Sequence, residues 1–159
     1  MTLTTIEASG SRYALRRAER DDVEAILELL AGDVLRREES RSDAAAARRA
    51  FEVIDADASQ LLVVVEGPGG AIVGTMQLTF IPGLSRGGAT RMQIEAVRVA
   101  ETLRGGGIGA AMIEWAIGHA RERGARLVQL TSDARRDAAH RFYERLGFEA
   151  SHVGFKLAL

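Results

Sequence analysis

The sequence predicts one α/β domain of the α+β type, in which a mixed, mostly antiparallel sheet of about seven strands is flanked by about four helices. Two apolar segments, 61–65 and 71–81, surround a GPGG turn, which is typical of a β-hairpin. Apolar residues recur at helical spacing in four other segments, and one of these helices separates strands expected at 90–99 and 127–131. A helical crossover joins parallel strands and a tight turn joins antiparallel ones, so we expect a mixed sheet.

The N-terminal third is expected to contain one strand and two helices. Residues 1–11 are small and polar and are expected to form a flexible leader, with a single domain over residues 12–159. Tyr13–Ala18 reads as a short strand. Asp21 then precedes an apolar periodicity with Glu24 three residues on, which is typical of a helix start, and Asp43 precedes a second helical periodicity.

The remaining elements follow from apolar runs and glycines. A long helix begins within the glycine-rich run, and Gly124 stands where a left-handed residue is expected to end it. A short helix at 138–146 stops at Gly147, and two last strands are expected at 148–151 and 155–159.

Composition excludes several classes of protein. A net charge of −1 offers no positive field for nucleic acid or an anionic membrane. The absence of cysteine removes disulfides, thiolate metal sites and cysteine nucleophiles, and the histidines lack metal-ligand spacing, so no metal is expected. With no signal-peptide pattern and no apolar run of about 20 residues, we expect a cytoplasmic protein.

Residues 104–110, RGGGIGA, place four glycines where a helix begins. A helix N-terminus with exposed amides favours anions, above all phosphate. A Walker A loop is excluded because no Lys-Ser/Thr follows, and a dinucleotide fingerprint is disfavoured because no carboxylate stands about 20 residues on. A glycine-rich turn that binds nothing is the remaining alternative.

The segment VRVAETLRGGGIGAAMIEWA resembles the acyl-CoA-binding motif of the GNAT superfamily of N-acyltransferases. In that motif a strand leads through a turn into Arg/Gln-x-x-Gly-x-Gly/Ala at the start of a long helix, and Arg104, Gly107 and Gly109 fall on it. A second segment, AHRFYERLGFEASHVGFKLAL, resembles the closing segment of the family. The residues at the usual spacing there are Ala139, Phe142, Tyr143, Gly147 and Phe148. The predicted order of elements matches the family fold over residues 13–159.

The resemblance implies where acetyl-CoA, the expected co-substrate, would bind. Adjacent strands are expected to separate at Val97–Val99, leaving backbone groups free to bond the pantetheine arm, while the glycine run holds the diphosphate. Arg136 occupies the position, three residues before Ala139, where many members have an asparagine that helps to hold this arm, so it would instead reach CoA phosphates or only solvate a helix start. The residues implied in cofactor binding are Val97, Val99, Arg104, Gly105, Gly106, Gly107, Ile108, Gly109, Ala110 and Arg136.

Acetyl transfer to an amine needs a neutral amine, a polarised carbonyl and a proton for the departing thiolate. Tyr143 matches the position where many family members place the general acid; its alternative is a core aromatic role. Glu95 is the expected base, because strand alternation places it on one face with Val97, whose N–H would stabilise the oxyanion. Substrate anchoring, a structural salt bridge and a water-relayed proton remain alternatives to this role.

Several residues are expected to contact the amine that accepts the acetyl group. Phe80 is expected to supply an apolar wall, Gln93 replaces an acid found in other members, and His152, in the last turn, is a further candidate base or substrate contact. Charged residues that would attract the acceptor, or only solvate the surface, are Arg36, Arg37, Glu38, Glu39 and Arg86.

These observations predict an N-acetyltransferase that moves an acetyl group from acetyl-CoA to a small amine, such as an amino acid, a polyamine or an amine antibiotic. Direct attack is expected because no cysteine can carry the acyl group. One alternative is acetylation of protein lysines or N-termini, and another is a non-catalytic acyl-CoA-binding regulatory module. Homodimers, often involving the last strands, are common in the family, so a homodimer is also considered.

Overall fold

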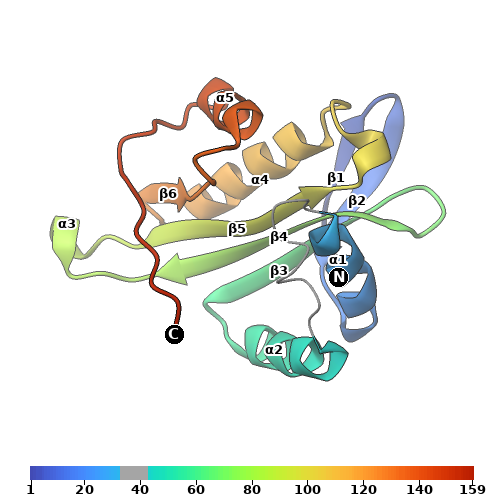
Figure 1. The fold of residues 1–159 in the computed structure, drawn as a ribbon, viewed down its shortest axis with the longest axis horizontal. Helices are drawn as coiled ribbons and strands as arrows, with labels where there is room; N and C mark the ends of the chain where they lie inside the picture. The colour runs from blue at the N-terminus through green and yellow to red at the C-terminus, as the bar shows by residue number, and fades with distance from the viewer. Residues whose placement is uncertain (33–42) are drawn as a thin grey trace.

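The computed structural model of the protein describes residues 1–32 and 43–159. Six strands form one sheet, in which spatial order follows chain order (Figure 1). The strands are β1 (Thr2–Ala8), β2 (Ser11–Arg17), β3 (Gln60–Glu66), β4 (Ile72–Ile81), β5 (Arg91–Val99) and β6 (Leu127–Leu130). Neighbouring strands are antiparallel except β5 and β6, which are parallel. The mixed, mostly antiparallel sheet is therefore confirmed, with six described strands instead of about seven.

The four longer helices are those that the sequence predicts. They are α1 (Val23–Ala31), α2 (Ala44–Ala56), α4 (Ile108–Glu122) and α5 (Asp137–Arg145), and α3 (Ser85–Gly88) is a short kinked turn. Asp43 begins α2 by accepting a hydrogen bond from the Ala45 N–H at 2.9 Å. Gly124, with φ of +73°, ends α4 as expected.

The sheet separates two hydrophobic cores. Met76 and Leu78 pack with α4 on one face, while Val64 packs with Ile26 of α1 and Phe51 of α2 on the other. Successive side chains of a strand point to opposite faces, so the continuous apolar run of β3 supplies both cores. Among the helices of the described residues, none has the length and hydrophobicity needed to cross a lipid bilayer.

The expected leader is wrong, because residues 2–8 form the edge strand β1 and pair with β2. Ile6 and Ala8 are each 8% exposed and join the core beneath α4. The threonines and the glutamate of this strand gave it a polar composition, which hid the alternation of its two buried residues. The folded domain therefore includes β1 and does not begin at residue 12.

The prediction of two last strands at 148–151 and 155–159 is also wrong. After α5 the chain has no strand, and residues 151–159 are exposed throughout. Phe155 is 94% exposed. A strand is stabilised by a paired neighbour, and the alternating apolar residues of this segment have no sheet partner among the described residues.

Candidate active site

Strands β5 and β6 separate at the middle of β5. They pair only from Arg91–Leu127 to Ile94–Leu130, while β5 continues to Val99 against β4 alone. The sequence prediction that strands separate beside Val97 and Val99 is therefore confirmed. Beyond Ile94, β5 therefore has no strand neighbour on its β6 side among the described residues, and α4 and α5 lie on one side of this part of the sheet (Figure 1).

A β-bulge lies where the strands separate. Gln77 pairs with Glu95 and Thr75 with Arg98, so Met76 faces two residues of β5, Ala96 and Val97. Ala96 has φ of +53°, a left-handed conformation that is costly for any residue other than glycine. Backbone strain of this kind concentrates at functional sites, which supports a functional interpretation of this point in the sheet.

The bulge overturns the expected alternation. Val97 and Val99 pack with the α4 core, together with Ile94. Glu95 pairs with Gln77, whose side chain bonds Gln60 on the opposite face, and Glu95 is exposed. Glu95 and Val97 therefore lie on opposite faces of the sheet, because the extra residue of a bulge shifts the two-residue alternation.

The backbone of Val97 and Val99 is directed away from β4. The Ala100 N–H donates to the Val73 carbonyl at 2.8 Å, so alternation turns the backbone groups of Val99 and Val97 to the other side, where β6 no longer pairs. The family resemblance implies that these backbone groups are free, but both carbonyls accept hydrogen bonds from arginine side chains. Val97 O accepts from an Arg98 guanidinium nitrogen at 2.7 Å, and Val99 O accepts from Arg104 Nε at 3.2 Å.

The glycine run forms an open turn before α4. Gly105 and Gly107 have φ of +80° and +92°, which L-residues with side chains rarely adopt. Gly107 is the N-cap of α4, and no side chain of the described residues caps this end. The amides of Ile108, Gly109 and Ala110 lie in the first helical turn, so no carbonyl within the helix can accept from them. The turn therefore has the geometry of an anion-binding site.

Tyr143 of α5 lies on the α4 side of the sheet. It packs against the same α4 core as Val97 and Val99, and its ring contacts Phe142 and Phe148 edge-on. Burial raises the pKa of Tyr143 above its ordinary value of 10.0, while the charges of Arg136 and Arg98 act in the opposite direction. Tyr143 is therefore protonated at neutral pH, with two guanidinium groups close enough to influence it.

Glu95 lies on the α1 and α2 face of the sheet, beside a polar strip that includes Gln77, Gln93 and Gln129. Gln129 donates to Gln93 at 2.7 Å, and Gln60 accepts from Gln77 at 3.0 Å and from Thr79 at 2.8 Å. Gln93 thus lies on the same face as Glu95, as two residues of a regular strand segment should.

Other candidate residues lie apart from this arrangement. Phe80 is 6% exposed, with Arg123 over its ring at 4.2 Å and His119 at its edge, so it packs as a core residue, and its role as an acceptor wall stays a prediction. His152 is exposed, bonds only locally to Ser151, and lies outside any strand. Arg86 is exposed in α3, and the remaining charged candidates, Arg36, Arg37, Glu38 and Glu39, lie outside the described residues.

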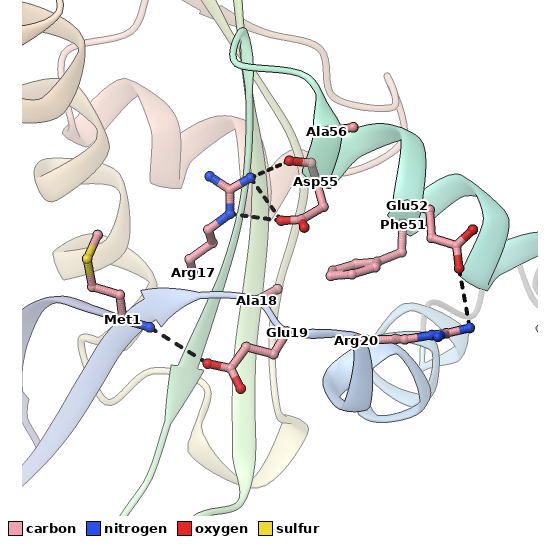
Figure 2. Close-up of a pocket in the computed structure, with 9 residues that line it drawn as sticks. All are labelled: Met1, Arg17, Ala18, Glu19, Arg20, Phe51, Glu52, Asp55 and Ala56. Carbon is pink, nitrogen blue, oxygen red and sulfur yellow. Dashed lines mark hydrogen bonds and ion pairs between the residues drawn. The ribbon is translucent and has the colours of Figure 1, made fainter.

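A hollow of about 480 Å³ lies elsewhere, between the end of β2 and α2 (Figure 2). Its charged side chains pair with one another: Arg17 bonds Asp55 at 2.9 Å and Arg20 bonds Glu52 at 3.3 Å. Neither Tyr143, Glu95 nor the glycine turn lines it. This hollow therefore has no part in the arrangement described above.

Sequence comparison agrees with the geometry, since residues 23–148 match the Acetyltransferase (GNAT) family. The chain belongs to the GNAT family. Membership places the chain among acetyltransferases, as the sequence predicts, and confirms the expected fold.

Two relatives of the chain are named as N-acetyltransferases. The chain is 40% identical over 67 residues to an aminoalkylphosphonate N-acetyltransferase of Salmonella typhimurium, covering 42% of this chain and 44% of that protein. It is 37% identical over 92 residues to a glucosamine 6-phosphate N-acetyltransferase of Trypanosoma brucei brucei, covering 58% and 60%. These matches span less than two thirds of either relative.

Solved structures match over nearly the whole chain. A transcriptional regulator from Bacillus halodurans C-125 is 43% identical, covers 92% of this chain and 99% of its own, and has a TM-score of 0.88. An acetyltransferase of Trypanosoma brucei is 30% identical, covers 92% and 99%, and has a TM-score of 0.76.

Two residues near the GNAT motif escaped sequence reasoning. Arg98 donates a hydrogen bond to the Val97 carbonyl, and its charge lowers the pKa of Tyr143. Its only signal in the sequence was a positive charge within an apolar strand. Ser9 donates to the Gly106 carbonyl at 3.0 Å across 97 residues of chain. No local pattern could indicate that contact, because residues 1–11 read as a leader.

Proposed function

We propose that this chain transfers an acetyl group from acetyl-CoA to the primary amine of a small molecule by direct attack. The observation that supports this most strongly is the placement of the open glycine turn, the unpaired end of β5 and Tyr143 on one side of the sheet. The turn would bind the diphosphate, the strand edge would bind the pantetheine arm, and Tyr143 would supply the proton that the departing thiolate needs.

The glycine turn and the end of β5 would bind the cofactor. Its diphosphate would accept hydrogen bonds from the amides of Gly105 and 107–110, with Arg104 adding positive charge, whereas the Gly106 N–H already donates to the Leu103 carbonyl at 3.3 Å. The β5 edge at Val97–Val99 would bond the pantetheine arm in the direction that β6 leaves open. Arg104 and Arg98 would have to leave the Val99 and Val97 carbonyls if the arm uses them. The Val97 N–H is the proposed donor to the acyl oxygen as negative charge develops there.

Tyr143 would give a proton to the departing thiolate of CoA. It packs against the same core as the strand segment that would hold the thioester, and its raised pKa keeps the hydroxyl protonated. Arg136 and Arg98 lower the same pKa and would stabilise the phenolate left after the proton has gone. Arg136 therefore acts through Tyr143 in this proposal, in addition to the phosphate contact expected from the family resemblance.

Glu95 would take the proton of the attacking amine. Because it lies on the face opposite Tyr143, the amine would approach from the α1 and α2 side, while acetyl-CoA lies on the α4 and α5 side. The amine would have to reach the thioester beyond Ile94 and Leu130, where β5 and β6 stop pairing. Acid and base then act on opposite sides of the carbonyl, which keeps the proton acceptor away from the thiolate.

A small-molecule acceptor is supported by the relatives, whose names specify an aminoalkylphosphonate and an amino sugar phosphate. The polar strip of Gln77, Gln93 and Gln129 beside Glu95 supplies amide groups that suit such hydroxylated or anionic compounds. His152 remains a proposed contact only if its exposed segment moves toward this face.

Two measurements test the proposal. Calorimetry should detect acetyl-CoA binding, and a pooled library of small amines and peptides should release CoA thiol when the accepted amine is present. An absence of binding at millimolar acetyl-CoA would refute the assignment. Release of thiol with peptides alone would replace the small-molecule acceptor with a protein lysine or N-terminus.

A regulatory module is the second candidate, because the Bacillus halodurans relative is named a transcriptional regulator. Such a module would bind acetyl-CoA and turn over no amine in the library. Binding without thiol release therefore distinguishes it from the enzyme.

A further inference from the structure

We infer that Ser9, in the turn between β1 and β2, is a positioning residue for the diphosphate-binding turn. This inference rests on the proposed function. Its basis is one long-range hydrogen bond: Ser9 Oγ donates to the Gly106 carbonyl at 3.0 Å. The bond fastens the β1–β2 hairpin to the middle of the glycine run.

The bond fixes the direction of a neighbouring amide. The Gly106 carbonyl and the Gly107 N–H belong to one planar trans peptide group, so they point in opposite directions. With the carbonyl held toward the hairpin, the Gly107 N–H points away from it. Gly107 is the N-cap of α4, so this amide lies next to the first-turn amides of the helix. Ser9 therefore sets the orientation of one donor in the proposed cradle.

The close fit shows why a glycine stands at position 106. A Cβ at this position would overlap Ser9 Oγ, whereas it would lie 3.5 Å from Ser9 Cβ, an ordinary contact. Gly106 does not itself have a positive φ. The need for glycine at 106 thus comes largely from the serine hydroxyl, with the Leu103 carbonyl at 3.2 Å as the second constraint.

Ser9 holds a backbone conformation that does not favour serine. Its φ of +50° lies in the left-handed region, and Gly10 follows with φ of +74°. A turn chosen for stability alone would favour glycine, asparagine or aspartate at this position. The hydroxyl contact with Gly106 gives a reason for serine here.

The test is CoA binding by calorimetry with wild type, Ser9→Ala and Ser9→Gly. Both variants lose the hydroxyl, so the Kd for CoA should rise about three- to tenfold, the effect of one hydrogen bond. Ser9→Gly also relieves the left-handed conformation, so it should not lower Tm below that of Ser9→Ala. If Ser9→Ala and Ser9→Gly lose CoA affinity equally but differ in Tm, the loss of affinity comes from the missing hydroxyl and not from lower stability. Ser11→Ala is the matched control, because Ser11 lies in the same hairpin and has no described contact with the glycine run.

Two further readouts complete the test. The Gly107 amide resonance of ¹⁵N-labelled wild type should shift on addition of CoA, and that shift should shrink in Ser9→Ala. Gly106→Ala should weaken CoA binding less in the Ser9→Ala background than in wild type. Unchanged CoA binding in Ser9→Ala would overturn the role of Ser9 alone, whereas a wild type that binds no CoA would overturn the proposed function.

Discussion

Glu95 and Val97 lie on opposite faces of β5, although only one residue separates them. The bulge at Ala96 produces this arrangement, with φ of +53° at a residue other than glycine. In our proposal the bulge divides the site, since it directs Glu95 to the acceptor side and leaves Val97 on the same face of the sheet as Tyr143. Four predictions test this arrangement and its surroundings.

Tyr143→Phe should lower kcat about 100-fold while KM for acetyl-CoA changes little, because only proton transfer to the thiolate is lost. Steady-state kinetics with the accepted amine measures this. The chain has one other tyrosine, Tyr13, which is 4% exposed in the core, and Tyr13→Phe should leave kcat unchanged. Since burial raises the Tyr143 pKa above 10.0, the midpoint of any loss of kcat caused by its deprotonation should lie above pH 10.0. An unchanged kcat in Tyr143→Phe would remove the acid role.

Glu95→Gln should lower kcat/KM about 100-fold at neutral pH, because the amine then loses its base. The deficit should narrow as pH rises, since the free amine deprotonates without help. A pH profile of kcat/KM for both proteins checks this. Glu114→Gln, on the exposed side of α4, is the matched control and should follow wild type. A deficit that stays constant with pH would point to substrate anchoring instead.

Gly107→Ala and Gly118→Ala should have opposite effects on stability within one helix. Gly107 has φ of +92°, so a Cβ there should lower the free energy of unfolding by about 1–2 kcal/mol. Gly118 lies inside α4, and a Cβ added to it would meet no atom within 4 Å, so alanine there should raise the free energy of unfolding by about 0.5–1 kcal/mol. Urea denaturation measures both. Gly107→Ala should also weaken CoA binding, and stabilisation by this change would contradict the described turn.

Asp22→Asn should reduce the loss of unfolding free energy that the protein shows as pH falls into the acid range. Burial by itself would raise the pKa of Asp22, but hydrogen bonds from Arg16 and the Glu19 N–H hold it below 3.8. A carboxylate with a lowered folded pKa stabilises the protein above its unfolded pKa, and this contribution is lost as pH falls below 3.8. Arg16 bonds both Asp22 oxygens, at 2.7 and 2.8 Å, so Asp22→Asn should cost about 2 kcal/mol at neutral pH. Denaturation between pH 2 and 7 measures this, with Glu7→Gln in the exposed Arg12 pair as the control.

Local patterns of residue type and spacing were enough to predict several parts of the structure. The helix starts at Asp43 and after Gly107, the hairpin of β3 and β4, and the glycine turn each follow from the type and spacing of neighbouring residues. The GNAT family and the position of Tyr143 on α5 follow from the same short-range motifs.

Other features depend on contacts between segments that are distant in the sequence, and these could be seen only in the folded chain. Residues 2–8 form a strand because β2 and the α4 core are available to them, and the last segment forms none because no neighbour among the described residues pairs with it. Phe80 is a core residue because α4 covers it, and Glu95 leaves the face of Val97 because β4 and β5 pair with a bulge. Pairing register and burial are properties of two segments together, so no spacing within one segment can specify them.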